Sequence, residues 1–253
     1  SALLLLLARW VGKREDRQGE ADRRDARRLS SRRERFNTQK PQPRSTDRMT
    51  TVEFFFDASS PWTYLAFTGI EKLCAETGAT LVWKPILVGG VFNTVNPSVY
   101  ERREKPVPVK DAYYKKDMQD WARVCGITIG EPKVFPVNSV KAMRGAFIAE
   151  AKGKLSPYLA AVFKAYWTDL RDISQDDVLR DIVGRVGIDP DQFIQAINEQ
   201  SVKDKLRANT DELIRRGGFG SPTLFVDGDD MYFGNDRLAL VRIAIERKQG
   251  RTA

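Results

Sequence analysis

The stretch FFFDASSPWTYLAF, residues 54–67, decides how this chain folds. Its three consecutive phenylalanines are typical of a buried strand, and the run ends at Asp57. A Ser-Pro turn follows, and a proline in the first turn is a common start of a helix. Apolar residues such as Ala66 and Ile70 then recur at helical spacing up to Gly78, which suits a helix C-terminus. The sequence therefore predicts a strand, a tight corner and a helix.

The elements around this corner predict its fold. TLVWKPIL, residues 80–87, is a second strand, and a crossover of about twenty residues implies a parallel, right-handed βαβ unit. Near the other end, residues 221–226 and 230–234 flank Asp227-Gly228, which is a hairpin signal. Residues 235–248 have the apolar spacing of a closing helix. The order βαβ…ββα predicts an α/β chain with a thioredoxin-like fold.

The middle of the chain is predicted to be a large all-helical domain, inserted into this fold at approximately residues 98–216. The clearest helical segments are 110–126, 138–153, 157–167, 178–187 and 201–216. We expect Ser156 with Pro157 to cap one helix, Ser174 with Asp177 to form a capping box, and Asp189 to cap another.

Residues 1–48 are predicted to be a basic, disordered leader before a domain of residues 49–253. They hold 14 of the 42 Lys/Arg and 7 of the 34 Asp/Glu, hence +7 of the net charge of +8. Five leucines at 3–7 are too few to span a membrane and precede the charges, unlike a signal peptide. A transit peptide or nucleic-acid-binding arm stays open. We expect an inert extension from a start site placed too early, because Met49 closely precedes a strand.

The cysteine and histidine content excludes several kinds of chemistry. Cys74 and Cys125 are far apart in the sequence, so the usual spacing of a zinc site or a redox pair is absent, and Cys74 is expected to be a buried thiol. The chain has no histidine. Ser-His-Asp and Cys-His catalysis and most transition-metal sites are thereby excluded, and we predict no metal.

The Ser-Pro corner lacks the sulfur atoms that redox proteins of this architecture carry. They place Cys-x-x-Cys here, and this chain has Ser60 and Thr63 at those positions. A helix N-terminus attracts anions, and in redox proteins that anion is the thiolate of the first cysteine. A serine hydroxyl can instead donate to a thiolate that a ligand brings. We therefore expect the site to host a thiolate that the protein does not supply.

One such hydrogen bond contributes about 1.5–3 kcal/mol, because its acceptor is charged. It could therefore lower the pKa of a bound thiol by roughly one to two, since one pKa unit is about 1.36 kcal/mol. The alternative is that Ser59 or Ser60 is only the N-cap of the helix.

Two other segments identify the ligand that would bring the thiolate. Ser221-Pro222 stands before the third strand, where thioredoxin-like folds carry a cis-proline that exposes backbone groups to an extended peptide. Residues 234–237 (GNDR) could bind the two ends of an amino acid, or could be only a turn with an N-cap. Thiol, peptide backbone and amino-acid head group together describe glutathione. Arg237 could bind the ligand or pair with a neighbouring carboxylate, and we expect the pairing.

The motifs FDASSPWTYLA, FGSPTLFV and MYFGNDRL resemble those of 2-hydroxychromene-2-carboxylate isomerases and the related kappa-class glutathione transferases. LVGGVFNTVNP and FPVNSVKAMR resemble two further segments of that family. The resemblance covers residues 52–246. It implies a DsbA-like fold, a homodimer, and bound glutathione.

The resemblance also assigns roles to residues. It implies Ser60 as the catalytic serine, and it places glutathione on Ser60, Ser221, Pro222, Phe233, Gly234, Asn235 and Asp236. The substrate pocket maps onto Asn93, Asn96, Asn138 and Ser139. Basic residues of the isomerases are replaced by Phe92, Asn93, Val99 and Tyr100, for which Arg102, Arg103, Lys105 or Lys110 could substitute. The substrate identity therefore stays open.

The implied activity is a glutathione-dependent isomerisation of 2-hydroxychromene-2-carboxylate-type aromatic catabolites, in which the thiolate adds reversibly to the substrate. A glutathione transferase or a non-catalytic glutathione-binding module are the alternatives, and the missing Cys-x-x-Cys argues against a disulfide oxidoreductase. We expect a cytoplasmic protein with a small aromatic substrate and neither nucleic acid nor membrane as a partner.

Overall fold

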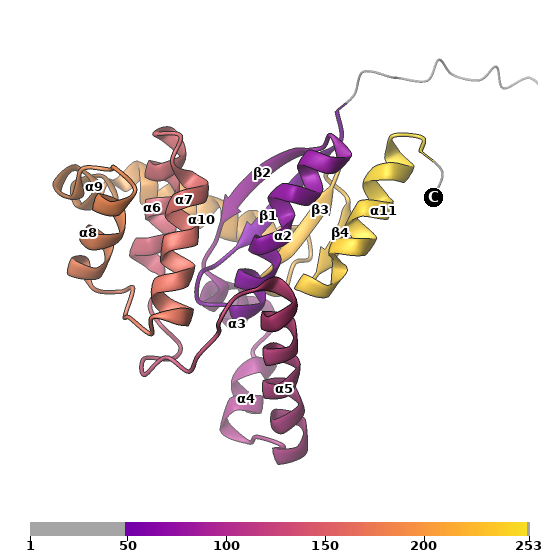
Figure 1. The fold of residues 1–253 in the computed structure, drawn as a ribbon, viewed down its shortest axis with the longest axis horizontal. Coiled ribbons are helices and arrows are strands. Elements are labelled where there is room, and N and C mark those ends of the chain that lie inside the picture. The colour runs from indigo at the N-terminus through magenta and orange to yellow at the C-terminus, as the bar shows by residue number, and fades with distance from the viewer. Residues whose placement is uncertain (1–48, 252–253) are drawn as a thin grey trace, which may run out of the picture. The chain divides into compact units, whose positions relative to one another are not determined.

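The computed structural model describes residues 49–251, and the prediction of a leader at residues 1–48 lies outside them. Within the described part, one sheet has the strand order β2-β1-β3-β4. These strands are β1 (Thr51–Phe56), β2 (Thr80–Pro85), β3 (Thr223–Val226) and β4 (Asp230–Phe233). β1 runs parallel to β2 and antiparallel to β3, and β3 runs antiparallel to β4. The first two and the last two strands of the described part thus form one sheet, although the helical segment separates them in the sequence (Figure 1).

The phenylalanine run of β1 builds a core on both faces of the sheet, because side chains alternate along a strand. Phe54 and Phe56 stack on each other at 5.7 Å in the larger core, where both also meet Trp83 of β2 edge to face. Phe55 points to the other face and packs against Phe225 of β3 at 5.6 Å. Both clusters fix β1 in the centre of the sheet.

Helices cover these two faces. α2 (Pro61–Thr77) and α11 (Leu238–Lys248) lie side by side on the face of Phe54. α10 (Gln200–Arg215) and α3 (Val88–Val95) pack against the face of Phe55. α2 starts as the sequence predicts, with Ser60 as N-cap and proline in the first turn, and it ends at Gly78 in the left-handed conformation (φ 70°).

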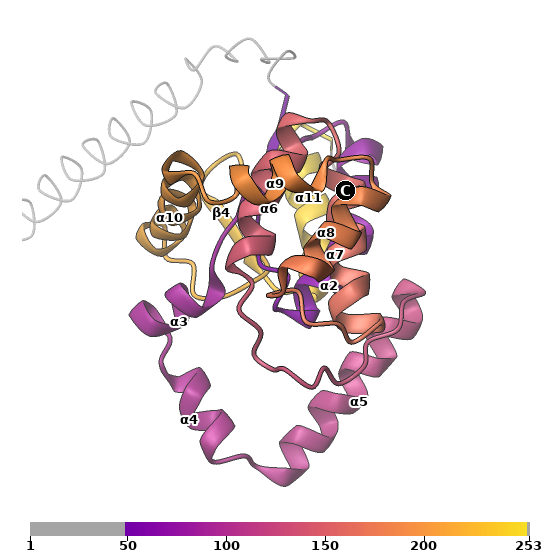
Figure 2. The ribbon, with the colours of Figure 1, turned by 90° about the vertical axis from the view of Figure 1, so that its left-hand side faces the viewer.

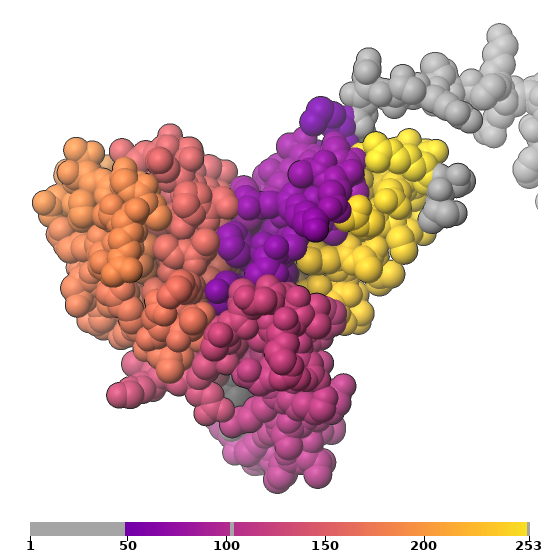
Figure 3. All heavy atoms as spheres, in the orientation of Figure 1, coloured from indigo at the N-terminus to yellow at the C-terminus, as the bar shows by residue number. Residues whose placement is uncertain are grey.

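The segment between β2 and β3 is mostly helical, as predicted for residues 98–216, and one further helix, α3, precedes that range. The segment holds α3, α4 (Ser98–Glu104), α5 (Pro108–Cys125), α6 (Val140–Ala151), α7 (Leu155–Phe163), a π-helical turn (Lys164–Thr168), α8 (Asp176–Arg185), α9 (Pro190–Ala196) and α10. In Figure 2, α6 to α9 form one group, and α4 and α5 extend away from it. Figure 3 shows α5 directly below α2 on the drawn face.

Two of the predicted helix caps are wrong. Ser156 lies inside α7, whose N-cap is Lys154, and its hydroxyl donates to Glu71 of α2 instead. Ser174 does not cap α8, because Asp172 accepts its N–H in a local turn and Gln175 occupies the N-cap position. A serine in a loop can bond to several nearby groups, so its sequence position alone does not fix the cap. The cap by Asp189, which accepts the N–H of Gln192, is confirmed.

The C-terminal part follows the prediction closely. The bond between Ser221 and Pro222 is cis, directly before β3. β3 and β4 form the hairpin, with Val226 opposite Asp230, so the loop holds three residues. Asp227 and Gly228 both have positive φ, which Asp and Gly tolerate best. The thioredoxin-like fold with its helical insertion is therefore confirmed.

Candidate functional site

Ser60 lies at the corner between β1 and α2, where its hydroxyl makes two hydrogen bonds. Its oxygen accepts the N–H of Thr63 at 3.3 Å, and its proton is donated to the carbonyl oxygen of Ser221 at 2.9 Å. The residue is only 9% exposed. Ser60 is thus the cap of α2, as one of its two predicted roles requires, and it also links the helix to the cis-proline loop, while its role toward a thiolate stays a prediction.

Ser221 is fixed to the same corner through its side chain. Its hydroxyl oxygen accepts the backbone N–H of Asp57 at 2.9 Å and lies 2.7 Å from the hydroxyl oxygen of Thr63. Thr63, which stands where redox proteins carry their second cysteine, therefore holds the loop that precedes β3. The sequence does not predict this contact of the Thr63 hydroxyl, because its partner lies 158 residues away.

The N-terminus of α2 is suited to an anion. No acidic residue stands in its first turn, so the positive end of the helix dipole keeps its charge uncompensated by side chains of that turn. Trp167 donates its indole N–H to the carbonyl of Ala58 at 2.9 Å and thereby closes the corner from the helical domain. The arrangement can stabilise a negative charge that arrives next to Ser60.

Asp57 is a buried carboxylate directly under this corner. It is 1% exposed, and its two oxygens accept the N–H of Ser59 at 2.9 Å and the N–H of Val88 at 2.8 Å. Ser139 also hydrogen-bonds to the carboxylate. Burial raises the pKa of Asp57, and these hydrogen bonds oppose that rise. Asp57 is not among the predicted site residues, although a carboxylate directly after three buried phenylalanines is a signal for a special role.

The turn of residues 233–236, on which the resemblance places glutathione, lies next to the cis-proline loop. The N–H of Gly234 donates to the carbonyl of Pro222 at 3.1 Å, and Gly234 has φ 108°, a conformation that favours glycine. Asn235 is buried, whereas Asp236 pairs with Arg237 at 2.8 Å, as expected for that arginine. Phe233 is 40% exposed. The structure thus brings Ser60, Ser221, Pro222 and Gly234 into one connected group.

The residues predicted to bind substrate are less closely assembled. Asn96 donates to the carbonyl of Phe219, two residues before Ser221, and Ser139 reaches Asp57. Asn93 accepts from the hydroxyl of Tyr100, and exposed Asn138 accepts the N–H of Val140. The structure therefore connects Asn96 and Ser139 to the corner, while Asn93 and Asn138 are held by local contacts.

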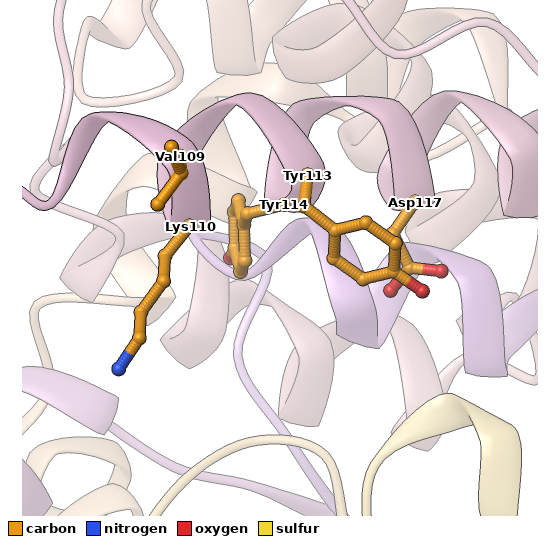
Figure 4. A pocket seen from close by; sticks show the side chains of 5 residues that line it. All are labelled: Val109, Lys110, Tyr113, Tyr114 and Asp117. Atoms are coloured by element: carbon orange, nitrogen blue, oxygen red, sulfur yellow. The ribbon is translucent and has the colours of Figure 1, made fainter.

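A hollow of about 460 Å³ lies along α5 (Figure 4). Its lining residues are Val109, Lys110, Tyr113, Tyr114 and Asp117. Trp62, in the first turn of α2, donates its indole N–H to the hydroxyl of Tyr114 at 2.5 Å, and the two rings meet edge to face at 5.1 Å. This contact joins the wall of the hollow to the corner. One of the predicted cations, Lys110, lines this hollow together with the two tyrosines and Asp117, while the structure does not describe the side chains of Arg102 and Arg103.

The two thiols do not take part in this site. Cys74 is buried, and burial together with Glu71 raises its pKa to about 11, which disfavours a thiolate. Cys125 lies on α5 with its thiol 3.9 Å from the carbonyl oxygen of Leu65.

Within residues 49–251, no group of three or more Cys, Asp or Glu side chains is placed to hold a metal ion. No helix in the same part of the chain is long and apolar enough to cross a membrane.

Comparisons with known proteins agree with this geometry. A family model described as the DSBA-like thioredoxin domain matches residues 51–246. The 2-hydroxychromene-2-carboxylate isomerase of Pseudomonas putida is 31% identical over 201 residues, which are 78% of this chain and 94% of the isomerase. Glutathione S-transferase kappa 2 of Caenorhabditis elegans is 30% identical over 75% of this chain and 89% of its own length. Both names denote enzymes. The first supports the predicted isomerase class, and the second supports a glutathione transferase as the alternative.

Solved structures show the same relationship. The structure of a 2-hydroxychromene-2-carboxylate isomerase superposes with a TM-score of 0.67 at 30% identity, covering 78% of this chain and 95% of that one. A probable DsbA oxidoreductase from Streptomyces coelicolor reaches 0.63 over 81% of this chain and 92% of its own, but at 16% identity it shows the fold alone. The chain thus belongs to the DSBA-like thioredoxin domain family and, within it, to the family of the 2-hydroxychromene-2-carboxylate isomerases.

Proposed function

We propose that this protein is a glutathione-dependent isomerase of 2-hydroxychromene-2-carboxylate-type aromatic compounds. The observation that carries the proposal is the hydrogen bond of 2.9 Å between the Ser60 hydroxyl and the Ser221 carbonyl. It brings the helix N-terminus, which favours an anion, next to the backbone that precedes the cis-proline. A peptide that carries a thiol would offer its thiolate to the helix N-terminus and its backbone to the residues before the cis-proline.

The described residues fit glutathione at three points. Ser60 and the N-terminus of α2 would hold the thiolate, the backbone of Ser221 would bind the peptide, and residues 233–236 would hold the γ-glutamyl end. Glutathione, when bound there, would supply a nucleophilic thiolate that the chain itself lacks. Asp236 is already paired with Arg237, so a ligand amino group would share this carboxylate with the arginine.

Ser60 would act by changing its hydrogen-bond acceptor. In the structure its proton goes to the neutral carbonyl of Ser221, and on binding it would be donated to the thiolate. A bond to a neutral acceptor contributes about 0.5–1.5 kcal/mol and a bond to a charged acceptor about 1.5–3 kcal/mol. The net gain is thus about 1 kcal/mol, which corresponds to a decrease of just under one in the pKa of the thiol.

Lys110 is the residue that we assign to the carboxylate of the substrate. It lies in the hollow with Tyr113 and Tyr114, whose rings offer flat surfaces to an aromatic compound. Tyr114 contacts Trp62, which stands two residues after Ser60, so the hollow is connected to the proposed thiolate site. Asn96 and Ser139, which contact the corner region, remain the other substrate-binding candidates.

A glutathione transferase of the kappa class is the second candidate, supported by the relative in Caenorhabditis elegans at 30% identity. It would use the same serine and the same thiolate, and would differ only in an acceptor that keeps the glutathione. A non-catalytic glutathione-binding module would share the binding residues without any turnover. We also infer a homodimer and a cytoplasmic location, which sedimentation of the purified protein and fractionation of its host cells would test.

The decisive experiment measures the interconversion of hydroxychromene carboxylate by the full chain, with and without glutathione. We expect acceleration only when glutathione is present. If the protein binds glutathione and accelerates nothing, the isomerase proposal fails, and conjugation of a set of electrophiles then separates the transferase from the binding module. If the protein binds no glutathione, the assigned cofactor is wrong.

A further inference from the structure

Asp57 connects elements that lie on opposite sides of the site. On one side its carboxylate accepts the N–H of Ser59, which belongs to the turn that carries Ser60. On the other side it accepts the N–H of Val88, the first residue of α3, and it hydrogen-bonds to Ser139, the N-cap residue of α6. One buried side chain therefore joins the corner of α2 to the starts of two other helices.

The backbone of Asp57 adds to this connection. Its N–H donates to the Ser221 hydroxyl at 2.9 Å, and its carbonyl accepts the N–H of Ser60 at 3.1 Å. A single residue thereby contacts both serines assigned to glutathione and, through α3 and Ser139, the segments that carry the residues assigned to substrate.

The chemistry of the side chain explains why a carboxylate stands here. Both oxygens face backbone N–H donors, and a carboxylate is the side chain of this size with two acceptor oxygens. An amide would turn its NH₂ group toward one of these donors and leave that N–H without an acceptor. Because Asp57 is 1% exposed, water cannot readily replace the lost partner.

α3 depends on this contact at its N-terminus. Its N-cap, Leu87, has no side-chain acceptor for the first N–H groups of the helix, and Asp57 supplies one from another element. The negative charge also lies at the positive end of the α3 dipole, which is a stabilising arrangement. α3 carries Asn93 and leads directly to Asn96.

We propose that Asp57 is a positioning residue that couples α3, on the substrate side, to the serine corner, on the glutathione side. It touches neither ligand in this role. The kinetic part of the inference rests on the proposed function, and the structural part does not. Its central bond is the one between the Asp57 carboxylate and the N–H of Val88.

That bond can be removed without changing Asp57. Val88→Pro deletes the N–H donor at the first position of a helix, where proline is favoured, and Leu87 before it already has the extended conformation that a following proline requires. Val88→Ala is the matched control, because it also removes the valine side chain but keeps the N–H. Comparison of the two variants isolates the hydrogen bond.

The first readout is amide hydrogen exchange of Val91, whose N–H bonds to Leu87 in the first turn of α3. We expect exchange about tenfold faster in Val88→Pro than in Val88→Ala, the effect of losing one bond to a charged acceptor. Proline by itself stiffens the start of a helix and would slow this exchange. Equal or slower exchange in Val88→Pro therefore overturns the structural part, whether or not the protein binds glutathione.

The second readout is steady-state kinetics with the full chain. We expect Val88→Pro to raise KM for the hydroxychromene substrate at least threefold over Val88→Ala, with the dissociation constant of glutathione equal in the two variants. Equal KM values in the two variants overturn the coupling. If the wild-type protein shows no turnover, the proposed function is wrong. The hydrogen-exchange experiment then tests the structural role of Asp57 by itself.

Discussion

The Ser60 hydroxyl donates to the carbonyl of Ser221, so a thiolate that binds next to Ser60 must replace this carbonyl as the acceptor. The carbonyl of Ser221 then loses this partner, and the N–H of a bound peptide can donate to the same oxygen. Filling the site therefore exchanges hydrogen bonds rather than simply adding them. The effect of a mutation at Ser60 is correspondingly modest for binding and larger for the ionisation of the thiol.

Ser60→Ala tests this division. We expect the pKa of glutathione bound to the variant to rise by just under one and turnover at neutral pH to fall several-fold, with less than a threefold change in glutathione affinity. Thiolate absorbance in a pH titration of the complex gives the pKa. Ser156→Ala, which changes a half-buried serine of α7 away from the site, is the control for replacing a hydroxyl. Equal losses in affinity and turnover would show that Ser60 only holds the ligand.

Lys110→Met removes the cation from the hollow while keeping most of the side-chain length. We expect a rise of about tenfold in KM for a carboxylate substrate, since a bond between two charged groups is lost, and no change for an uncharged electrophile. Lys116→Met is the matched control, because Lys116 lies on the same helix and pairs with Asp120. A rise of the same size in both variants would remove Lys110 from the site.

Asp57 also gives the folded protein a specific pH dependence. Burial raises its pKa above the usual value near 4 that it has in the unfolded chain, so the folded state binds this proton more tightly. Its contribution to stability is complete below pH 4 and declines as the pH rises through the raised pKa. We expect the free energy of unfolding of the wild type, relative to Asp57→Asn, to decrease over that window in urea titrations. A difference in the free energy of unfolding that increases with pH would show that the hydrogen bonds lower the pKa of Asp57 more than burial raises it.

At the scale of elements, the face of the sheet beneath α10 holds a cluster of opposite charges. Arg216, just after α10, bonds to Glu53 of β1 at 2.6 Å and to Glu212 at 2.7 Å, while Lys84 of β2 lies 3.1 Å from Glu212. The guanidinium group also lies 3.8 Å from the ring centre of Phe225. Strands β1 to β3 and α10 are thus joined by one partly buried network.

Arg216→Met is expected to lower the free energy of unfolding by about 2–3 kcal/mol, because two carboxylates lose their partner in a partly buried place. Arg242→Met, which removes an exposed pair with Glu76, should cost less than about 1 kcal/mol. Urea unfolding of both variants makes the comparison. Similar losses would mean that the network contributes no more than a surface ion pair.

The sequence predicts elements well where the signal is local. The phenylalanine run, the proline after Ser60 and the left-handed Gly78 each act within a few residues, and each prediction is confirmed. The contacts of Asp57 with Val88 and Ser139 could not be predicted, because they depend on how the chain returns through space. Ser156 illustrates the limit in the other direction, since its hydroxyl contacts a neighbouring helix rather than capping its own.

For the molecule as a whole, the site residues assigned here all fall within one compact unit that starts at Met49. We therefore expect a chain of residues 49–253 to show the kcat/KM of the full chain within a factor of two. Kinetics of both chains at low and high salt make the test, since any role of the basic residues 1–48 in attracting an anionic substrate would be screened by salt. A large loss at low salt alone would assign them that role.

The pairing of β1 with β3 has a consequence for biosynthesis. Val52 pairs with Val226, so β1 can pair early with β2 but lacks β3 until residue 226 has left the ribosome. Closing so long a loop is slow and costly in entropy unless the intervening helices have already become compact. Until α10 has been synthesised, the Phe55 face of β1 is not fully covered, and exposed apolar surface of this kind is what chaperones bind. The contact between Ser60 and Ser221 spans the same interval, so the site forms only when folding is almost complete, and a chain that stops before residue 221 never acquires it.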